Sequence, residues 1–253
     1  MVELALTPDR KWNAAPADLV AASAAVGFTG LGINARDVDD SIVEAYGRAG
    51  LRCHELLVLW VDGAPDTVLD AAAQLVPAAE RIGAEWILTA LAGDGSDELL
   101  TALQRSAAMF AEVGAGMAVE FTPEGPVTTI DEGLEVVRAV QPHGRAGLLI
   151  DTWHFTMGES SWEDLEGVPV DEIAYIQFDD VVAPVSESFI AETLHRRAVP
   201  GDGVADLDRF ATTLLERGWD GTVSVEVLNA ELRERPLADI VQTLYDASAP
   251  YWR

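Results

Sequence analysis

Four short apolar segments of the chain each carry, near their end, a polar side chain that can accept a proton or bind a cation. Residues 148–150, Leu-Leu-Ile, run directly into Asp151, and His154 follows three residues later. The polar residues of the other three segments are Glu120, Gln177 and Glu226. A carboxylate inside a sheet is costly unless it is paired or binds a metal, so three of them at strand ends indicate a cation site.

The segment 223–227, Val-Ser-Val-Glu-Val, shows which way such a side chain points. Alternate residues of a strand face opposite sides, so the three valines share one face and Ser224 and Glu226 the other. We therefore expect Glu226 to point away from the face that helices cover. For Asp151 there is a simpler alternative, in which it caps the following turn and His154 is a half-buried surface residue.

Composition limits the classes of function. A chain of 253 residues with 49% hydrophobic content suits one domain, residues 1–253, and an α/β barrel commonly has this length. The formal net charge of -27 favours solubility and argues against nucleic acid and anionic membranes as partners. Lys11, the only lysine, lies in a polar N-terminal segment, which argues against Schiff-base chemistry on a buried lysine.

Cys53 is the only cysteine, so the sequence has neither an internal disulfide nor a cysteine-based zinc cluster. We interpret it as a small core residue of a protein in a reducing compartment. The sequence shows no signal peptide and no apolar run long enough to span a bilayer. We therefore expect a soluble, cytoplasmic protein.

Strand-like and helix-like segments alternate along the chain, which predicts parallel strands joined by right-handed crossovers. The expected strands are 2–6, 30–34, 51–59, 85–90, 117–121, 148–151, 173–178 and 223–227. An open doubly wound sheet would carry a Gly-rich first turn, and residues 7–10 are not one. In a closed barrel the polar strand ends would meet at one mouth. We predict a single α/β domain, a (β/α)8 TIM barrel with its site at the C-terminal mouth.

Five motifs in this order resemble the xylose-isomerase-like barrel superfamily, the sugar phosphate isomerases and epimerases. They are Val119-Glu120-Phe121-Thr122-Pro123, Ile150-Asp151-Thr152-Trp153-His154, Ile176-Gln177-Phe178-Asp179-Asp180, Arg197-Ala198-Val199-Pro200-Gly201-Asp202-Gly203 and Ser224-Val225-Glu226-Val227. The resemblance extends from about residue 120 to residue 229. The chain departs from the commonest pattern at Gln177, where the family most often has His; some members similar to 3-dehydroshikimate dehydratases also have Gln there.

The resemblance implies metal ligation by Glu120, Asp151, Gln177 and Glu226. It also implies that His154 and Arg197 contact substrate oxygens. Three carboxylates and an amide oxygen suit one hard divalent cation, Mn²⁺ or Mg²⁺, with Co²⁺ also compatible.

A cation chelated by a carbonyl oxygen and the neighbouring hydroxyl of a small keto or hydroxy substrate would stabilise an enediolate. Glu120 and Glu226 would then act as base and acid. Return of the proton to the opposite face gives epimerisation, and return to the adjacent carbon gives isomerisation. If His154 instead protonates a departing β-hydroxyl, the protein is a dehydratase (a lyase) of the 3-dehydroshikimate or inosose type. We expect an isomerase or epimerase first and the dehydratase second.

Several nearby residues have two interpretations each. Glu55 contacts substrate or forms a salt bridge at a strand end. Trp153, like Trp12 and Trp60, lines a carbohydrate pocket or packs in the core. Asp179 and Asp180 orient a ligand or cap a turn.

The segment 181–206 is a lid that brings Arg197 over the metal, or an ordinary surface excursion. His195 or Arg196 can replace Arg197 if the loop register differs. The remaining two histidines, His54 and His143, are expected to be structural.

Two other classes of protein share this barrel. A DNA-repair endonuclease needs several His-bound metals and a basic groove, and four histidines with a net charge of -27 argue against it. The other class is a barrel that binds a small molecule without catalysis. Absence of metal binding, or full activity after Glu120 and Glu226 are changed to Gln, would indicate it. The sequence leaves open a homo-oligomer.

Overall fold

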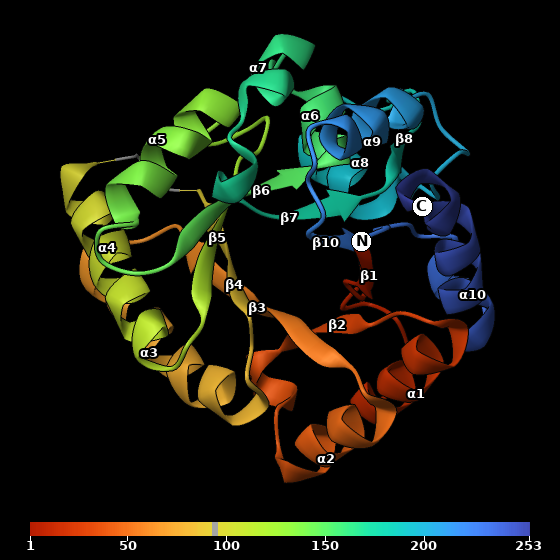
Figure 1. The fold of residues 1–253 in the computed structure, drawn as a ribbon, viewed down its shortest axis with the longest axis horizontal. Coiled ribbons are helices and arrows are strands. Elements are labelled where there is room, and N and C mark those ends of the chain that lie inside the picture. Colours follow the sequence, from red (N-terminus) through yellow and green to blue (C-terminus); the bar gives the residue numbers. More distant parts are fainter. Residues whose placement is uncertain (93–95) are drawn as a thin grey trace.

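A computed structural model describes residues 1–92 and 96–253, and at its centre eight parallel strands close into a barrel (Figure 1). Around the barrel the strands are β1 (Glu3–Leu6), β10 (Thr222–Val225), β7 (Ile173–Phe178), β6 (Ala146–Asp151), β5 (Gly116–Glu120), β4 (Trp86–Leu91), β3 (Arg52–Val61) and β2 (Gly30–Asn34). Pairing of β1 with β10 closes the ring. The predicted (β/α)8 barrel is confirmed.

Helices surround the barrel on the outside, as Figure 1 shows. They are α1 (Pro16–Val26), α2 (Asp40–Ala49), α3 (Pro65–Ile82), α4 (Asp97–Glu112), α5 (Ile130–Val140), α6 (Thr152–Met157), α7 (Trp162–Gly167), α8 (Phe189–His195), α9 (Leu207–Glu216) and α10 (Leu237–Ser248). Local chemistry sets their ends. Asp39 accepts a hydrogen bond from the Ile42 N–H at the start of α2, and Gly50 ends that helix with φ 68°.

Alternation along the strands divides the core into two layers. Val223, Val225 and Val227 pack in the layer between strands and helices, as their period of two predicted. The opposite faces point into the barrel, where an apolar cluster fills the lumen. Its buried members are Leu57, Leu88, Ala90, Ala118, Leu149, Ala174 and Tyr175.

The segment 181–206 is more regular than the sequence indicated. It contains α8, followed directly by β9 (Arg197–Ala198), which pairs antiparallel with β8 (Asp180–Val181). This small sheet lies outside the barrel pairing and fixes the position of Arg197 beside the end of β7. Elsewhere the predicted strand bounds shift slightly; β10 ends at Val225, so Glu226 lies one residue beyond it.

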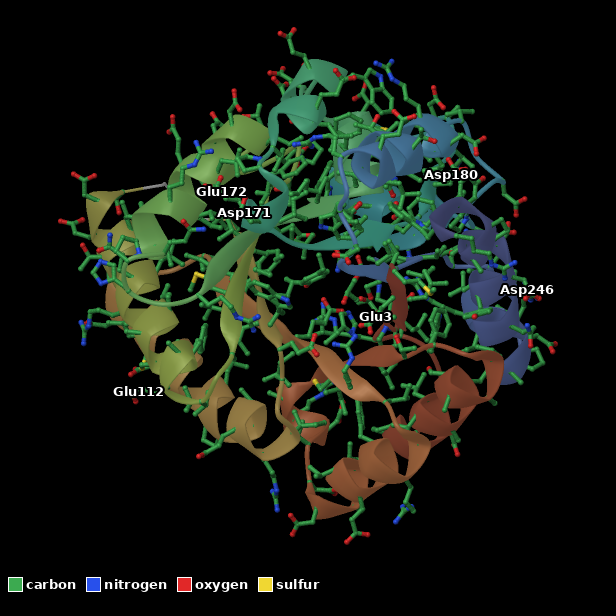
Figure 2. All side chains as sticks on the ribbon, in the orientation of Figure 1. Glu3, Glu112, Asp171, Glu172, Asp180 and Asp246 are labelled. Atoms are coloured by element: carbon green, nitrogen blue, oxygen red, sulfur yellow. The ribbon has the colours of Figure 1, made fainter. Side chains whose placement is uncertain are left out.

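The outer surface carries much of the negative charge. Figure 2 shows Glu112 and Asp246 projecting away from the barrel, and both are exposed. Within residues 1–92 and 96–253, no helix is both long enough and apolar enough to cross a membrane.

Candidate active site at the barrel mouth

The four predicted ligands come from four neighbouring strands. Glu120 ends β5, Asp151 ends β6, Gln177 lies near the end of β7, and Glu226 follows β10. Strand register brings them together, because Asp151 pairs with Gln177 and Gln177 pairs with Ser224, two residues before Glu226. All four therefore lie at the C-terminal mouth of the barrel.

Gln177 lies between two of the carboxylates. The end of its side chain is 3.3 Å from Asp151 Oδ2 and 3.3 Å from Glu120 Oε1. An amide nitrogen in this position donates to both oxygens. A half-turn of the amide brings its oxygen to the same place, where it can ligate a cation shared with Asp151 and Glu120.

His154 belongs to the same cluster. Its Nε2 lies 3.5 Å from Glu120 Oε1 and 3.8 Å from Asp151 Oδ2. One potential ligand atom each from Glu120, Asp151 and His154 lies within 4.8 Å of the other two. The geometry thus makes His154, predicted as a substrate contact and acid, a candidate ligand as well.

Asp151 uses its two oxygens differently. Oδ1 accepts the N–H groups of Trp153 at 2.7 Å and His154 at 3.2 Å, which caps α6. Oδ2 faces Gln177 and His154. The structure thus shows the capping role of Asp151, and metal ligation through Oδ2 stays a prediction. His154, however, is buried with 4% exposure rather than half-buried.

Arg197 lies among the carboxylates. Its Nη1 is 2.5 Å from Asp151 Oδ2, 2.8 Å from Asp179 Oδ2 and 3.2 Å from Glu226 Oε2. Its Nε and Nη2 donate to the backbone carbonyl and hydroxyl of Thr193, both at 3.1 Å. The resemblance implied that Arg197 contacts substrate oxygens, and Arg197 does border the cavity. It is also 2% exposed, and its charge is held by buried carboxylates.

Burial and charge move the pKa values of these groups apart. Burial alone would raise the pKa of Asp151, but the charge of Arg197 and the hydrogen bonds from Arg197 and from the His154 N–H outweigh it, and the pKa is lowered. Burial raises the pKa of Glu226 well above its usual range; Arg197 opposes this, and the carboxylates of Asp151 and Glu120 add to it. A carboxyl group that retains its proton more readily than its neighbours suits proton transfer at neutral pH.

A cavity of about 550 Å³ opens at this mouth. Its polar side includes Glu120, His154, Arg197 and Glu226. Its apolar wall includes Leu57, Val58 and Trp60 of β3 and Leu88, Ala90 and Leu91 of β4. Helix α8, from the segment expected to form a lid, contributes Phe189, Ile190, Thr193 and Leu194. The predicted catalytic groups thus share one cavity with room for a small molecule.

Glu55 lies elsewhere. It is fully buried inside the barrel, where its carboxylate accepts hydrogen bonds from Thr7 Oγ1 and, at 2.5 Å, from the Tyr175 hydroxyl. It is not among the residues that line the mouth cavity, so the expected substrate contact is corrected to a buried hydrogen-bond partner. The hydroxyl groups of Thr7 and Tyr175 thus satisfy both carboxylate oxygens without a ligand, and Ser224 Oγ in turn bonds Thr7.

Trp153 supports the site from behind. Its ring packs edge-on against His154 at 5.4 Å, and the Arg197 guanidinium lies 5.5 Å from its centroid. Only Trp60 of the three tryptophans considered lines the mouth cavity. Trp153 therefore packs against His154 and Arg197, and it does not line the cavity wall.

Asp179 and Asp180, which follow β7, hold nearby segments of the backbone and the Arg197 side chain in place. Asp179 accepts from Thr152 Oγ1 at 2.7 Å and pairs with Arg197. Asp180 accepts the N–H groups of Val181, Gly201, Gly203 and Ala205. Asp179 thus positions Arg197, and Asp180 shapes the loop after β9.

The alternatives to Arg197 have other partners. Arg196 Nε donates to Glu192 at 2.9 Å, and His195 Nδ1 lies 2.7 Å from Arg233 Nη1. Of the two histidines expected to be structural, His54 is fully buried with its ring edge-on to Tyr175, and His143 is exposed.

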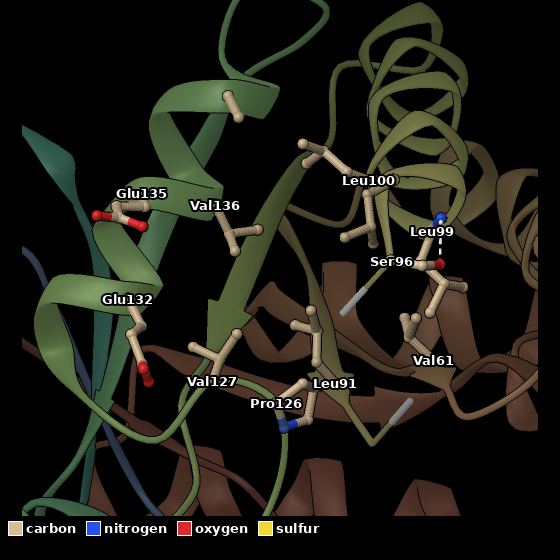
Figure 3. A pocket seen from close by; sticks show the side chains of 12 residues that line it. Val61, Leu91, Ser96, Leu99, Leu100, Pro126, Val127, Glu132, Glu135 and Val136 are labelled. Carbon is tan, nitrogen blue, oxygen red and sulfur yellow. Dashed lines mark hydrogen bonds between the residues drawn. The ribbon is translucent and has the colours of Figure 1, made fainter. Parts of the chain in front are cut away.

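A second cavity, of about 460 Å³, lies between α4 and α5, where Leu100 and Val136 come from facing helices (Figure 3). Glu132 lines it but already accepts the N–H groups of Thr128 and Thr129 at the start of α5. Among the described residues it offers no set of proton-transfer groups comparable to that at the mouth, so the mouth is the better candidate site.

Comparison with known proteins finds relatives that are named as enzymes. An inosose isomerase from Halalkalibacterium halodurans is 31% identical over 139 residues, which cover 53% of this chain and 47% of that protein. A 3-dehydroshikimate dehydratase from Pseudomonas putida is 28% identical over 111 residues, covering 44% and 17% respectively. The chain thus matches about half the length of the first relative. Both relatives are named for enzymatic activities, in the two reaction classes that the sequence predicts.

Solved structures extend the fold comparison to the whole chain. A crystal structure of the IOLI protein with a bound zinc atom superposes with a TM-score of 0.87 at 19% identity, over 99% of this chain and 98% of that one. A model of the xylose isomerase-like TIM barrel family matches residues 20–247. The protein therefore belongs to the xylose isomerase-like TIM barrel family.

Proposed function

We propose that the protein is a divalent-metal-dependent isomerase or epimerase that moves a proton at the carbon beside the carbonyl of a keto-sugar or polyol-like substrate. The observation that carries this proposal is that Glu120, Asp151, Gln177 and Glu226 lie at the ends of four neighbouring strands. Glu120, Asp151 and His154 each offer a ligand atom within 4.8 Å of the other two, and Glu120, His154 and Glu226 line the mouth cavity. The names of the isomerase and dehydratase relatives support the same chemistry.

The residues present fit a cation. Glu120, Asp151 and Glu226 offer carboxylate oxygens, and the Gln177 amide lies 3.3 Å from two of them. Oxygen ligands suit Mn²⁺ or Mg²⁺, whereas the imidazole of His154 brings Co²⁺ and Zn²⁺ into range. When bound, a divalent cation stabilises negative charge that develops on a substrate carbonyl oxygen.

Glu120 and Glu226 are the candidate proton-transfer groups. They come from β5 and β10, on either side of the Asp151–Gln177 pair, and both border the cavity. If one carboxylate removes the proton and the other returns it to the opposite face of the same carbon, the product is an epimer. Return to the neighbouring carbon gives an isomer.

Dehydration is the second candidate, and His154 favours it. Its imidazole borders the cavity, and its Nε2 lies 3.5 Å from Glu120 Oε1. It can thus donate a proton to a hydroxyl that leaves from the β carbon, after Glu120 or Glu226 has removed the proton beside the carbonyl. This outcome uses the same base and differs only in the fate of the hydroxyl.

One experiment tests the common step. The protein is stripped with a chelator and assayed in D₂O with inososes, ketoses and 3-dehydroshikimate, with and without Mn²⁺. We expect turnover only with the cation and deuterium at the carbon beside the carbonyl; full retention of the original hydrogen would contradict the proposal. Glu226→Gln should lower turnover about 10²–10⁴-fold, whereas Glu112→Gln on the outer surface should not.

A further inference from the structure

Positive charge gathers at one rim of the mouth. The chain has 43 acidic and 16 basic residues, yet Arg10, Lys11 and Arg233 all line the mouth cavity. Arg10 and Lys11 lie on the connection between β1 and α1, and Arg233 on the connection between β10 and α10. Because β1 and β10 are neighbours in the barrel, the three cations come from the same side of the mouth.

The loop that carries Arg10 and Lys11 is held in place by a buried carboxylate. Asp9 is 5% exposed; its Oδ1 accepts the Lys11 N–H at 2.9 Å and its Oδ2 accepts Arg233 Nε at 2.6 Å. The Asp9 carbonyl oxygen accepts the Trp12 N–H at 2.9 Å. The backbone of residues 9–12 is therefore fixed at the rim.

The three cations differ in what they contact. Arg233 is occupied by Asp9, by His195 and by the Leu194 carbonyl oxygen. The side chains of Arg10 and Lys11 are exposed, and in the described part of the chain neither forms an ion pair or a hydrogen bond. Two adjacent cations without a counter-charge, on a chain this acidic, leave positive charge available to a ligand in the cavity.

The rest of the mouth restricts the shape of that ligand. The proton-transfer groups and candidate metal ligands lie at the ends of β5, β6, β7 and β10. The apolar wall of the cavity comes from β3 and β4. Arg10 and Lys11, the two cations for which the described chain offers no partner, follow β1. The apolar wall offers no side-chain hydrogen bond except from the indole of Trp60. A hydroxyl group on every carbon would thus leave some hydroxyls without a partner along this wall.

We propose that the substrate carries an oxyanion, a carboxylate or a phosphate ester, that Arg10 and Lys11 bind at the rim while its α-hydroxy ketone lies at Glu120 and Glu226. This inference rests on the proposed function for the position of the reacting end. It names the substrate class: an anionic keto compound with one apolar edge, in place of a neutral keto-sugar. Arg10 and Lys11 are then the residues that determine specificity.

Equilibrium binding tests the inference separately from catalysis. Titration calorimetry on the full chain with Mn²⁺ compares shikimate, its neutral methyl ester, myo-inositol and fructose 6-phosphate. We expect at least one anion to bind at least about tenfold more tightly than the neutral compounds. One charge-assisted hydrogen bond is enough to give a difference in affinity of this size. Shikimate and the phosphate distinguish the two sources of the oxyanion.

Variants assign the effect to the rim. Lys11→Met and Arg10→Met should each weaken binding of the preferred anion about tenfold and leave the neutral compounds unchanged, and Lys11→Arg should restore most of the loss. Arg48→Met, which removes an exposed cation that pairs with Glu44 on α2, is the matched control and should change nothing. Equal affinity for anions and neutral compounds, or no effect of the Arg10→Met/Lys11→Met double variant, would overturn the inference.

The two proposals fail in different ways. If the protein exchanges solvent deuterium into a neutral inosose with Mn²⁺, and Lys11→Met leaves that rate unchanged, the proposed function stands and the anionic substrate is wrong. If no substrate exchanges with any cation while shikimate or the phosphate still binds through Lys11, the proposed function is wrong and the anion site stands.

Discussion

Nη1 of Arg197 lies 2.5 Å from Oδ2 of Asp151, the same oxygen that faces the Gln177 amide and the His154 imidazole. One carboxylate oxygen is therefore within reach of two kinds of cation, a guanidinium from β9 and a divalent ion at the strand ends. The guanidinium and a bound metal ion would both be stabilised by the negative charge of Asp151. We therefore expect the stability of the protein and its affinity for metal to be coupled through Arg197.

Arg197→Met should destabilise the metal-free protein and increase the stabilisation that metal gives. Removal of one partner leaves Asp151 and Asp179 buried without their counter-charge, which costs about 3–5 kcal/mol. Urea unfolding with and without Mn²⁺ measures both effects. Arg196→Met, which removes the pair with Glu192 on α8, is the control. Equal metal-induced stabilisation in wild type and Arg197→Met would contradict the coupling.

Gln177→His should shift metal preference toward Zn²⁺ and Co²⁺ relative to Mg²⁺. The Gln177 side chain lies 3.3 Å from oxygens of both Asp151 and Glu120, so an imidazole there would supply a nitrogen ligand to the same cation. Gln177→Leu removes the ligand atom and should weaken the binding of Zn²⁺, Co²⁺ and Mg²⁺ alike. Competition titrations against a chromophoric chelator give the affinities. If neither variant changes them, Gln177 is not a ligand.

The strand ends could be predicted because their signal is local. An apolar run that ends in a carboxylate, together with alternation of period two, places Asp151 and Glu226 correctly from a few residues of sequence. The capping role of Asp151 follows from the same local pattern. Positions that depend on one strand and its own turn are thus within reach of sequence.

Side-chain positions that depend on partners far away in the sequence could not be predicted in this way. Glu55 points into the barrel toward Thr7 and Tyr175, 48 and 120 residues away along the chain, and the register of β3 with both neighbouring strands shifts nearby. Arg197 meets Asp151 across 46 residues. Nothing within their own segments indicates these partners. The free cations at residues 10 and 11 likewise gain significance only from the cavity beside them.

Asp180→Asn should loosen the loop at residues 199–206. Its two oxygens accept N–H groups from Val181, Gly201, Gly203 and Ala205, and an amide can accept through only one of its two end atoms. The N–H groups of Gly201 and Gly203 are partly open to water, so the loss of this acceptor should show mainly as faster local opening. Hydrogen exchange should therefore accelerate at Gly201 and Gly203.

Asp202→Asn, at an exposed position of the same loop, is the matched control for this change. It should leave the exchange rates of Gly201 and Gly203 as in wild type. If Asp180→Asn also leaves them unchanged, the Asp180 carboxylate does not hold the loop.

Cys53 should make the protein less stable at alkaline pH. The thiol is 2% exposed, and burial raises its pKa far above the usual value, with a smaller contribution from Glu55. In the unfolded chain the thiol ionises near about pH 8.5, whereas the folded thiol keeps its proton. As pH rises above that value the unfolded state loses the proton first, so the free energy of unfolding falls by up to about 1.4 kcal/mol per pH unit.

Urea unfolding between about pH 7.5 and pH 9.5 measures this slope, and Cys53→Ala should flatten it. The upper limit matters because burial also raises the pKa values of Tyr46 and Tyr175, whose ionisation in the unfolded chain begins to contribute near about pH 10. A thiol reagent should modify native Cys53 only at the rate at which the protein opens. Rapid modification without unfolding, or the same slope in Cys53→Ala, would show that the thiol is not buried in a protonated state.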